Sequence, residues 1–124
     1  MPTGGHRDLA AWQKGMELVR AVYRLTARLP ERERFGLTSQ LRRSVIAVPV
    51  NLAEGRRRRS DREFRRYVSI AHGALREVEV DVLIAIGLGY VPAAAARPIL
   101  DLAADTGLLL AGLHQTLTGR IGSA

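Results

Sequence analysis

Apolar residues recur along most of the chain with the three-and-four spacing of amphipathic α-helices, and no segment sustains the alternation of a β-strand. Four segments carry this pattern and predict helices over about residues 8–29, 37–55, 60–88 and 98–118. The connectors between them are only a few residues long, so consecutive helices are expected to pack in opposite directions. The pattern therefore predicts an all-α, antiparallel up-down-up-down four-helix bundle that fills residues 1–124 as a single domain.

Short signals in the sequence predict where the helices begin and end. Thr38 is the expected N-cap of the second helix, and Gly55 is the glycine expected to terminate it. Ser60 followed by Glu63 has the spacing of a capping box, which predicts the start of the third helix. The regular part of the fourth helix is expected to begin near Pro98.

Pro49 lies inside the predicted second helix. Because proline has no N–H group, it leaves the carbonyl of Val45 without its usual donor and predicts a kink. Asn51 is close enough in sequence to satisfy a backbone group that such a kink releases. At the other end of the chain, residues 119–123 contain two glycines and a serine, which predict a frayed tail.

The second half of the third helix is apolar on more than one face. Its apolar residues are Val78, Val80, Val82, Leu83, Ile84, Ile86 and Leu88. A helix that is apolar nearly all round is buried nearly all round, and a chain of 124 residues is too small to cover both sides. The pattern therefore predicts a homo-oligomer whose interface contains Val80, Leu83, Ile84 and Ile86.

Composition adds that the chain is strongly basic, with 19 basic and 12 acidic residues and a net charge of +7. It has no cysteine, which excludes disulfides, thiolate metal sites and cysteine nucleophiles. The first residues lack the apolar core of a secretory signal, and no apolar stretch approaches the length of about 20 residues that a membrane span needs. A cytoplasmic protein without membrane contact is the expectation.

The positive charge is concentrated around the predicted turn between the second and third helices. Seven arginines gather there, Arg56, Arg57, Arg58, Arg59, Arg62, Arg65 and Arg66. Helix-dipole compensation at the end of the second helix contributes about 0.3 to 1 kcal/mol and accounts for one or two of them. Contact with nucleic-acid phosphates would account for the set, with Lys14, Arg42 and Arg43 as extensions. A solvated surface or a dock for an acidic partner protein is the alternative.

The aromatic residues favour a contact with the backbone of RNA or DNA rather than with its bases. Trp12, Tyr23, Tyr67 and Tyr90 fall mostly on or beside apolar stripes, so the basic cluster is expected to lack stacking platforms. Binding is therefore expected to be electrostatic, with little preference for sequence.

Motifs of catalytic or metal chemistry are not recognisable in the sequence. His6, His72 and His114 lack the spacing of metal ligands, and the glycines at positions 87 and 89 lack the strand of a dinucleotide loop. Glu77, Glu79 and Asp81 are interpreted as partners for salt bridges between helices or subunits rather than as a metal site. Glu54 is expected to pair with Arg58. No cofactor, no metal and no enzymatic activity are predicted.

Several strings in the chain carry a family resemblance. They are His6-Arg7-Asp8-Leu9 with Trp12, residues 35–44 (FGLTSQLRRS), residues 48–55 (VPVNLAEG), and Ser60, Glu63, Phe64, Tyr67, Ile70, Ala71, Gly73, Leu75, Glu77 and Glu79. In these residues the chain resembles the 23S rRNA intervening-sequence proteins along nearly its whole length.

The resemblance implies a four-helix bundle that assembles as a pentamer, and it implies no particular catalytic activity. More distantly, the chain is similar to the accessory protein of diversity-generating retroelements, which is pentameric and basic and associates with a reverse transcriptase and nucleic acid. That likeness implies a reverse transcriptase or another nucleic-acid enzyme as a partner. The four successive arginines after Gly55 depart from the usual family pattern and strengthen the nucleic-acid interpretation.

Overall fold

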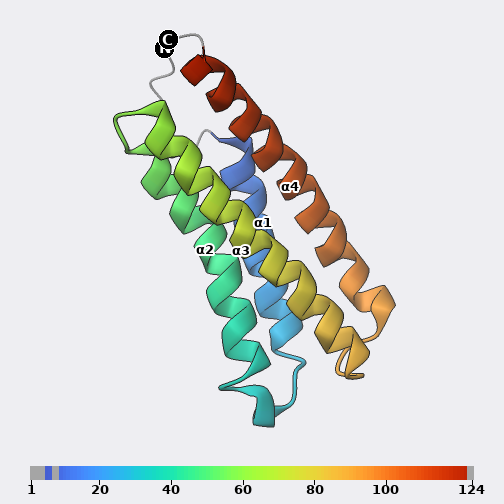
Figure 1. The fold of residues 1–124 in the computed structure, drawn as a ribbon. Helices are drawn as coiled ribbons and strands as arrows, with labels where there is room; N and C mark the ends of the chain where they lie inside the picture. Colours follow the sequence, from blue (N-terminus) through green and yellow to red (C-terminus); the bar gives the residue numbers. More distant parts are fainter. Residues whose placement is uncertain (1–4, 7–8, 123–124) are drawn as a thin grey trace.

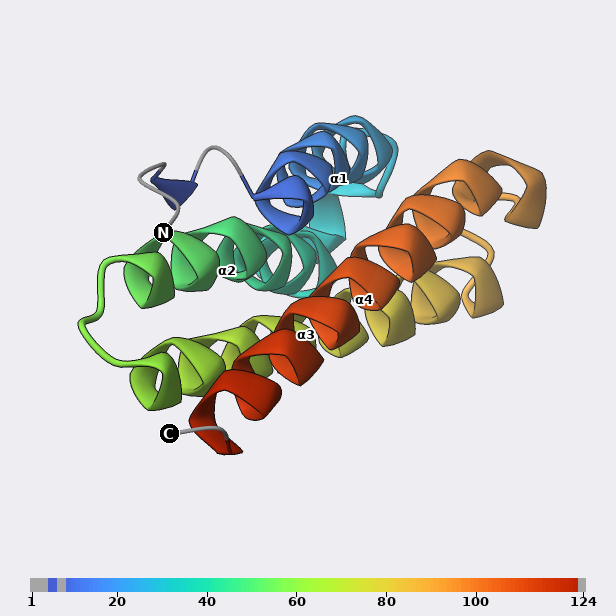
Figure 2. The same cartoon turned by 90° about the horizontal axis from the view of Figure 1, so that it is seen from above.

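The computed structural model describes residues 5, 6 and 9–122, and within them the chain folds into four α-helices and no strand. The helices are α1 (Ala10–Thr26), α2 (Leu37–Arg56), α3 (Asp61–Gly87) and α4 (Ala93–Gly122) (Figure 1). Each helix packs against the one before and the one after it, and α1 also packs against α4. The four helices thus surround one core, as the view from above shows (Figure 2).

Contacts between the ends of the helices set their directions. Arg120 near the end of α4 pairs with Asp61 at the start of α3, with 2.7 Å between nitrogen and oxygen. Consequently α3 and α4 run in opposite directions, and the α2–α3 turn lies beside the C-terminal end of α4 (Figure 1). At the other end, the Tyr90 hydroxyl of the α3–α4 connector donates to Glu33 of the α1–α2 connector at 2.8 Å.

The core is aliphatic and draws on one stripe from each helix. In α2 the apolar residues spaced by three and four positions form this stripe, since Leu41, Val45, Val48 and Leu52 are fully buried and Leu37 is partly exposed. The largest fully buried side chains contributed by the other helices are Leu18, Val22, Val68, Leu75, Val78, Val82, Leu110 and Leu117. Burial of this apolar surface supplies the main driving force for folding.

The predicted start of α2 at Thr38 is wrong. Gly36 occupies the N-cap position, and the Oε1 atom of Glu33 accepts the N–H of Leu37 at 3.0 Å. A carboxylate from the preceding connector thus caps the helix in place of a threonine hydroxyl. The same carboxylate accepts from Tyr90, and these two hydrogen bonds lower the pKa of Glu33 below its ordinary value.

Gly55 also differs from its predicted role, because it lies inside α2 and does not end it. A Cβ atom at Gly55 would lie 2.7 Å from Cβ of Tyr67 and 2.9 Å from Cδ1 of Phe64. The glycine is therefore required for the close approach of α2 and α3 next to their turn. Pro49 stays within α2, where the Asn51 side chain donates to the carbonyl of Ala47 at 2.8 Å.

The fourth helix is longer at both ends than predicted. It begins at Ala93 rather than near Pro98, because alanine has the highest helix propensity and residues 93–96 are all alanine. It continues to Gly122 instead of fraying from residue 119, with Arg120 held by Asp61. Ser123, which belongs to the predicted tail, lies outside the described residues.

The first helix is shorter than the predicted range of 8–29, since it ends at Thr26 in a turn, and Asp8 lies outside the described residues. Leu18, Val22 and Leu25 form an apolar stripe of α1 that enters the core, and a second apolar stripe borders an open groove between α1 and α2. That groove, called here the α1/α2 groove, has a volume of about 280 Å³. Its lining residues are Trp12, Met16, Val19, Ile46, Pro49, Val50 and Ala53.

An exposed apolar surface follows the outer side of α3, as the sequence predicted. This α3 face consists of Ile70, Val80, Leu83, Ile84 and Leu88, which are 41–57% exposed. Ile86, also predicted to belong to the interface, is instead partly buried and packs against the core of its own chain. No helix in the described part of the chain is both long enough and apolar enough to cross a bilayer.

Among the described residues, Glu77, Glu79 and Asp81 do not form the predicted salt bridges between helices. Glu77 accepts hydrogen bonds from Gln40 and Ser44 of α2, at 3.3 and 3.5 Å. Asp81 is only 8% exposed, and its Oδ2 atom has no hydrogen-bond partner among the described residues. Burial, together with the nearby Glu77, raises the pKa of Asp81 above its ordinary value.

Replacing Gly55 by alanine is expected to lower the free energy of unfolding by about 1 to 3 kcal/mol, because the added methyl group overpacks the α2–α3 contact. Chemical denaturation measures the change. Gly112 is the matched control, since a Cβ there meets nothing within 4 Å. Gly112→Ala should gain about 0.5 to 1 kcal/mol from helix propensity. Equal stability of the two variants would show that α2 and α3 are not in such close contact.

Replacing Asp81 by asparagine is expected to raise stability at pH 7 by about 1 to 2 kcal/mol, because it removes a buried, unpaired charge. The raised pKa means that the wild type loses stability as the pH rises from the unfolded value of 3.8 through the folded-state value. The advantage of Asp81→Asn should therefore vanish near pH 4 in denaturant titrations. Asp105→Asn, on the exposed side of α4, is the control and should change little. A destabilised Asp81→Asn at pH 7 would contradict an unpaired carboxylate.

Candidate nucleic-acid interface

The α2–α3 turn, residues 57–60, joins the end of α2 to the start of α3 and carries the centre of the arginine cluster. Ser60 is the N-cap of α3, and its hydroxyl oxygen accepts the N–H of Glu63 at 3.1 Å, as predicted. Asp61 and Glu63 stand in the first turn of α3, where negative charge is favourable. These carboxylates offset part of the repulsion between the arginines and the positive end of the helix.

Glu54 holds two arginines of the turn. Its Oε2 atom lies 2.7 Å from Arg58, which confirms the predicted pair, and its Oε1 atom lies 3.9 Å from Arg57. Both arginines remain largely exposed in spite of these contacts. They contribute to the positive field of the turn, although part of their charge is neutralised locally.

Tyr67 lies among the arginines of the cluster, although the sequence analysis placed the aromatic residues mostly on or beside apolar stripes. The guanidinium carbons of Arg58 and Arg66 lie over its ring, at 5.0 and 4.9 Å from the ring centroid. Arg58 also donates to the Tyr67 hydroxyl at 2.8 Å. The tyrosine thus orders two arginines by cation–π contact, and these arginines occupy its ring where a base would stack.

The remaining arginines of the cluster differ in whether they contact other side chains of the protein. Arg56 lies over the ring of Phe64 at 5.8 Å, and Arg65 donates to Thr118 of α4 at 3.2 Å. Arg59 and Arg62 are exposed, and neither has an ion-pair or hydrogen-bond partner among the described residues. These two side chains are the ones whose donors are available to an external anion.

Arg120 joins the cluster from α4, which the sequence analysis missed. It forms two hydrogen bonds with Asp61, at 2.7 and 3.2 Å, and this contact lowers the pKa of Asp61 below its ordinary value. With Arg120 included, eight arginines share this end of the bundle with the carboxylates of Glu54, Asp61 and Glu63. A five-charge excess therefore remains around the turn. No signal in the sequence pointed to it, because Arg120 lies beyond the predicted end of the helix at residue 118, in the predicted tail.

Two of the three predicted extensions of the cluster lie away from the turn. Arg42 stands 14 residues before Arg56 in α2, about 21 Å away at 1.5 Å per residue. It donates to Thr26 at 2.9 Å and lies over the Tyr23 ring at 4.5 Å. Its neighbour Arg43 is exposed, also far from the turn. Lys14 lies in the N-terminal half of α1 and pairs with Glu17 at 3.7 Å. The structure therefore does not bring Arg42 and Arg43 together with the seven arginines.

Two histidines that share no motif in the sequence come together between α3 and α4. His72 and His114 both line a depression of about 400 Å³, together with Ser69 and Arg76. No group of three or more histidine, cysteine or acidic side chains within the described residues is arranged to hold a metal ion.

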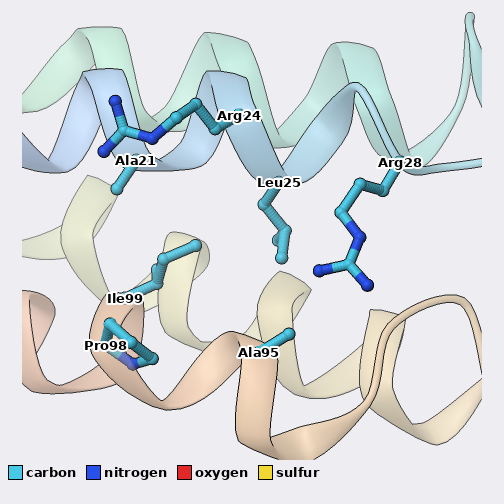
Figure 3. Close-up of a pocket in the computed structure, with 7 residues that line it drawn as sticks. All are labelled: Ala21, Arg24, Leu25, Arg28, Ala95, Pro98 and Ile99. Atoms are coloured by element: carbon cyan, nitrogen blue, oxygen red, sulfur yellow. The ribbon is translucent and has the colours of Figure 1, made fainter.

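A second depression, of about 240 Å³, lies between α1 and α4 (Figure 3). Leu25 of α1 and Ile99 of α4 point toward each other across it, and Arg24 and Arg28 flank Leu25 (Figure 3). These arginines lie near the C-terminal end of α1, at the opposite end of the bundle from the α2–α3 turn. They are thus separate from the cluster of the turn.

Comparison with known proteins supports the resemblance seen in the sequence. No curated protein matches the chain. A family model described as 23S rRNA-intervening sequence protein matches residues 7–112, which include all of α1, α2 and α3 and two thirds of α4. The match covers the whole α2–α3 turn and ends before Arg120. The chain therefore belongs to the 23S rRNA-intervening sequence protein family.

Proposed function

We propose that this protein binds the phosphate backbone of RNA or DNA through the α2–α3 turn. The observation that carries the proposal is that Arg59 and Arg62 are exposed, with no ion-pair or hydrogen-bond partner in the described part of the chain, inside a cluster with an excess of positive charge. Guanidinium groups donate paired hydrogen bonds to phosphate and release counterions on binding. If Arg59 and Arg62 had a structural role, we would expect them to form ion pairs with carboxylates, as Arg58 and Arg120 do.

The geometry of the turn favours backbone contacts over reading of the base sequence. Phe64 is buried, and Arg58 and Arg66 already lie over the ring of Tyr67. Contacts with phosphates position a protein on nucleic acid but carry no sequence information. The role is one of binding, with no catalytic step. The family name points to RNA as the first nucleic acid to test. A role in binding RNA would place the protein in the cytoplasm. A reverse transcriptase or another nucleic-acid enzyme would then be a candidate partner.

We further propose that the antiparallel bundle assembles into a closed ring of identical chains, a homopentamer as the family resemblance implies. Two different apolar surfaces support this assembly, the α3 face and the α1/α2 groove. Contact between unlike surfaces of neighbouring copies is heterologous, and it closes into a ring when the rotation permits. Each copy would bring one arginine cluster, so a ring would multiply the positive field.

The proposed binding predicts a salt-dependent affinity that fluorescence anisotropy measures with a 20-nucleotide single-stranded RNA. The double variant Arg59→Gln/Arg62→Gln removes two phosphate contacts, so the log–log salt slope should become shallower by about 1.4. The affinity near 100 mM salt should fall about tenfold or more, while helicity by circular dichroism stays unchanged because neither side chain has an ion-pair or hydrogen-bond partner among residues 5, 6 and 9–122.

The matched control is Arg24→Gln/Arg28→Gln, which removes the same charge from the other end of the bundle. Its affinity and salt slope should stay near those of the wild type. Equal losses in both double variants would show that only net charge matters and would contradict a site at the turn. No RNA or duplex DNA binding at low salt would favour the alternative, a surface that docks an acidic protein.

The proposed ring predicts that variants of either apolar surface lose assembly, as measured by light scattering. Leu83→Asp/Ile84→Asp in the α3 face and Ile46→Asp/Val50→Asp in the α1/α2 groove should each give a 13.6 kDa monomer, because each surface loses its apolar partner. Mixing the two variants should yield a dimer, since each retains the surface that the other lacks.

The control for the ring is Leu108→Asp, which places a charge at a side chain 74% exposed on α4, outside both surfaces. It should assemble like the wild type. A wild-type monomer at micromolar concentration would refute the ring. Two variants that stay monomeric when mixed would show instead that like surfaces pair with each other.

A further inference from the structure

A polar stripe leaves the α2–α3 turn and follows α3 along its border with α4. Its members are Arg62, Arg65, Ser69, His72 and Arg76, spaced by three, four, three and four residues. This spacing places all five on one side of the helix. The apolar core residues Val68 and Leu75 lie on the inner side of the same turns.

The C-terminal half of this stripe, residues 69–76, forms one wall of the depression between α3 and α4. Its lining combines Ser69, His72 and Arg76 of α3 with His114 of α4, in a volume of about 400 Å³. We call this set the α3/α4 groove. His72 reaches the backbone of α4, because a Cβ atom added at Gly107 would lie 3.8 Å from its Nε2 atom. The two imidazoles therefore face the same space from neighbouring helices.

The charges around the groove suit an anion rather than a cation. Arg76 is exposed, with no ion-pair or hydrogen-bond partner among the described residues. Partial burial, together with repulsion by Arg76 and by His114, lowers the pKa of His72, and Glu79 opposes this shift. His72 is consequently neutral near pH 7, and a bound anion beside it would favour its protonated form.

We propose that the α3/α4 groove is a second phosphate subsite for the nucleic acid held at the α2–α3 turn, occupied when His72 is protonated. This inference rests on the proposed function and extends it. In that state the groove presents the His72 imidazolium, an N–H group of the His114 imidazole, the Arg76 guanidinium and the Ser69 hydroxyl, all of which donate hydrogen bonds to phosphate oxygens.

The length of the stripe fits a nucleic-acid strand. From Arg62 to Arg76 it covers 14 residues of helix, or about 21 Å at 1.5 Å per residue. One strand of a duplex carries a phosphate about every 3.4 Å, so the stripe spans about six phosphates. A strand that contacts Arg59 and Arg62 would thus reach the groove without a change of direction.

The test compares binding of the 20-nucleotide RNA at pH 5.0 and pH 7.5 over a range of salt concentrations. In the wild type, protonation of His72 should add about one phosphate contact and steepen the log–log salt slope by about 0.7. Affinity should rise about threefold or more. In His72→Gln/His114→Gln the slope and affinity should be nearly independent of pH. Arg76→Gln should weaken binding at pH 5.0 and have little effect at pH 7.5.

Matched controls separate the groove from general charge effects. His6→Gln removes the third histidine of the chain, which contacts Trp12 outside the groove, and should keep the full pH response. Arg97→Gln should bind like the wild type, since Arg97 pairs with Asp101 elsewhere on α4.

The outcomes distinguish a failure of the groove from a failure of the proposed function. In one outcome, RNA binding is salt-dependent and is lost in Arg59→Gln/Arg62→Gln, but its pH response is the same with and without His72 and His114. This outcome would overturn the proposed subsite in the groove alone. Wild-type binding that does not depend on pH would also overturn the groove alone. Absence of RNA binding at both pH values would overturn the proposed function and the groove together.

Discussion

The approach of α2 and α3 at Gly55 is the contact on which the functional end of the molecule depends. The α2 backbone lies so close to Tyr67 and Phe64 that no side chain fits between them. This contact brings the last turn of α2 against the aromatic residues of the first turns of α3. Arg56 and Arg58 then extend over those rings, and the α2–α3 turn receives a defined shape instead of being a loose basic loop.

Concentrating so many arginines at one end of a small bundle generates repulsion, and the structure offsets only part of it. Glu54, Asp61 and Glu63 each hold at least one arginine, and the aromatic rings hold others by cation–π contact. Arg59 and Arg62 lack such partners. A cluster that is partly paired and partly open combines order with available donors, which a phosphate-binding surface requires.

The bundle also leaves apolar surface that it does not cover itself. A chain of 124 residues has a high ratio of surface to volume, so helices as long as α3 and α4 cannot bury all their apolar positions within one copy. Both the α3 face and the α1/α2 groove are exposed for this reason. The arginine cluster lies at the α2–α3 end of the bundle, whereas the two apolar surfaces run along its sides.

Much of the fold could be predicted from local sequence. Periodicity identified the four helices, and the buried stripe of α2 and the Ser60 cap of α3 follow from spacing alone. The helix boundaries that were predicted wrongly depend on contacts with other parts of the chain. Thr38 does not cap α2 because Glu33 does so from the connector, and α4 extends past residue 118 with Arg120 held by Asp61 of another helix.

The candidate site, like the fold, could be predicted from the sequence only where neighbouring residues determine it. The sequence by itself determined that seven arginines cluster at one turn, because they are neighbours along the chain or along one face of a helix. Only the tertiary structure decided which of them are paired, that Arg120 joins them and that Arg42 does not. It also brought His72 and His114 to one groove from residues 42 positions apart. Contacts between helices depend on packing, and packing is set by the whole core rather than by any local pattern of residues.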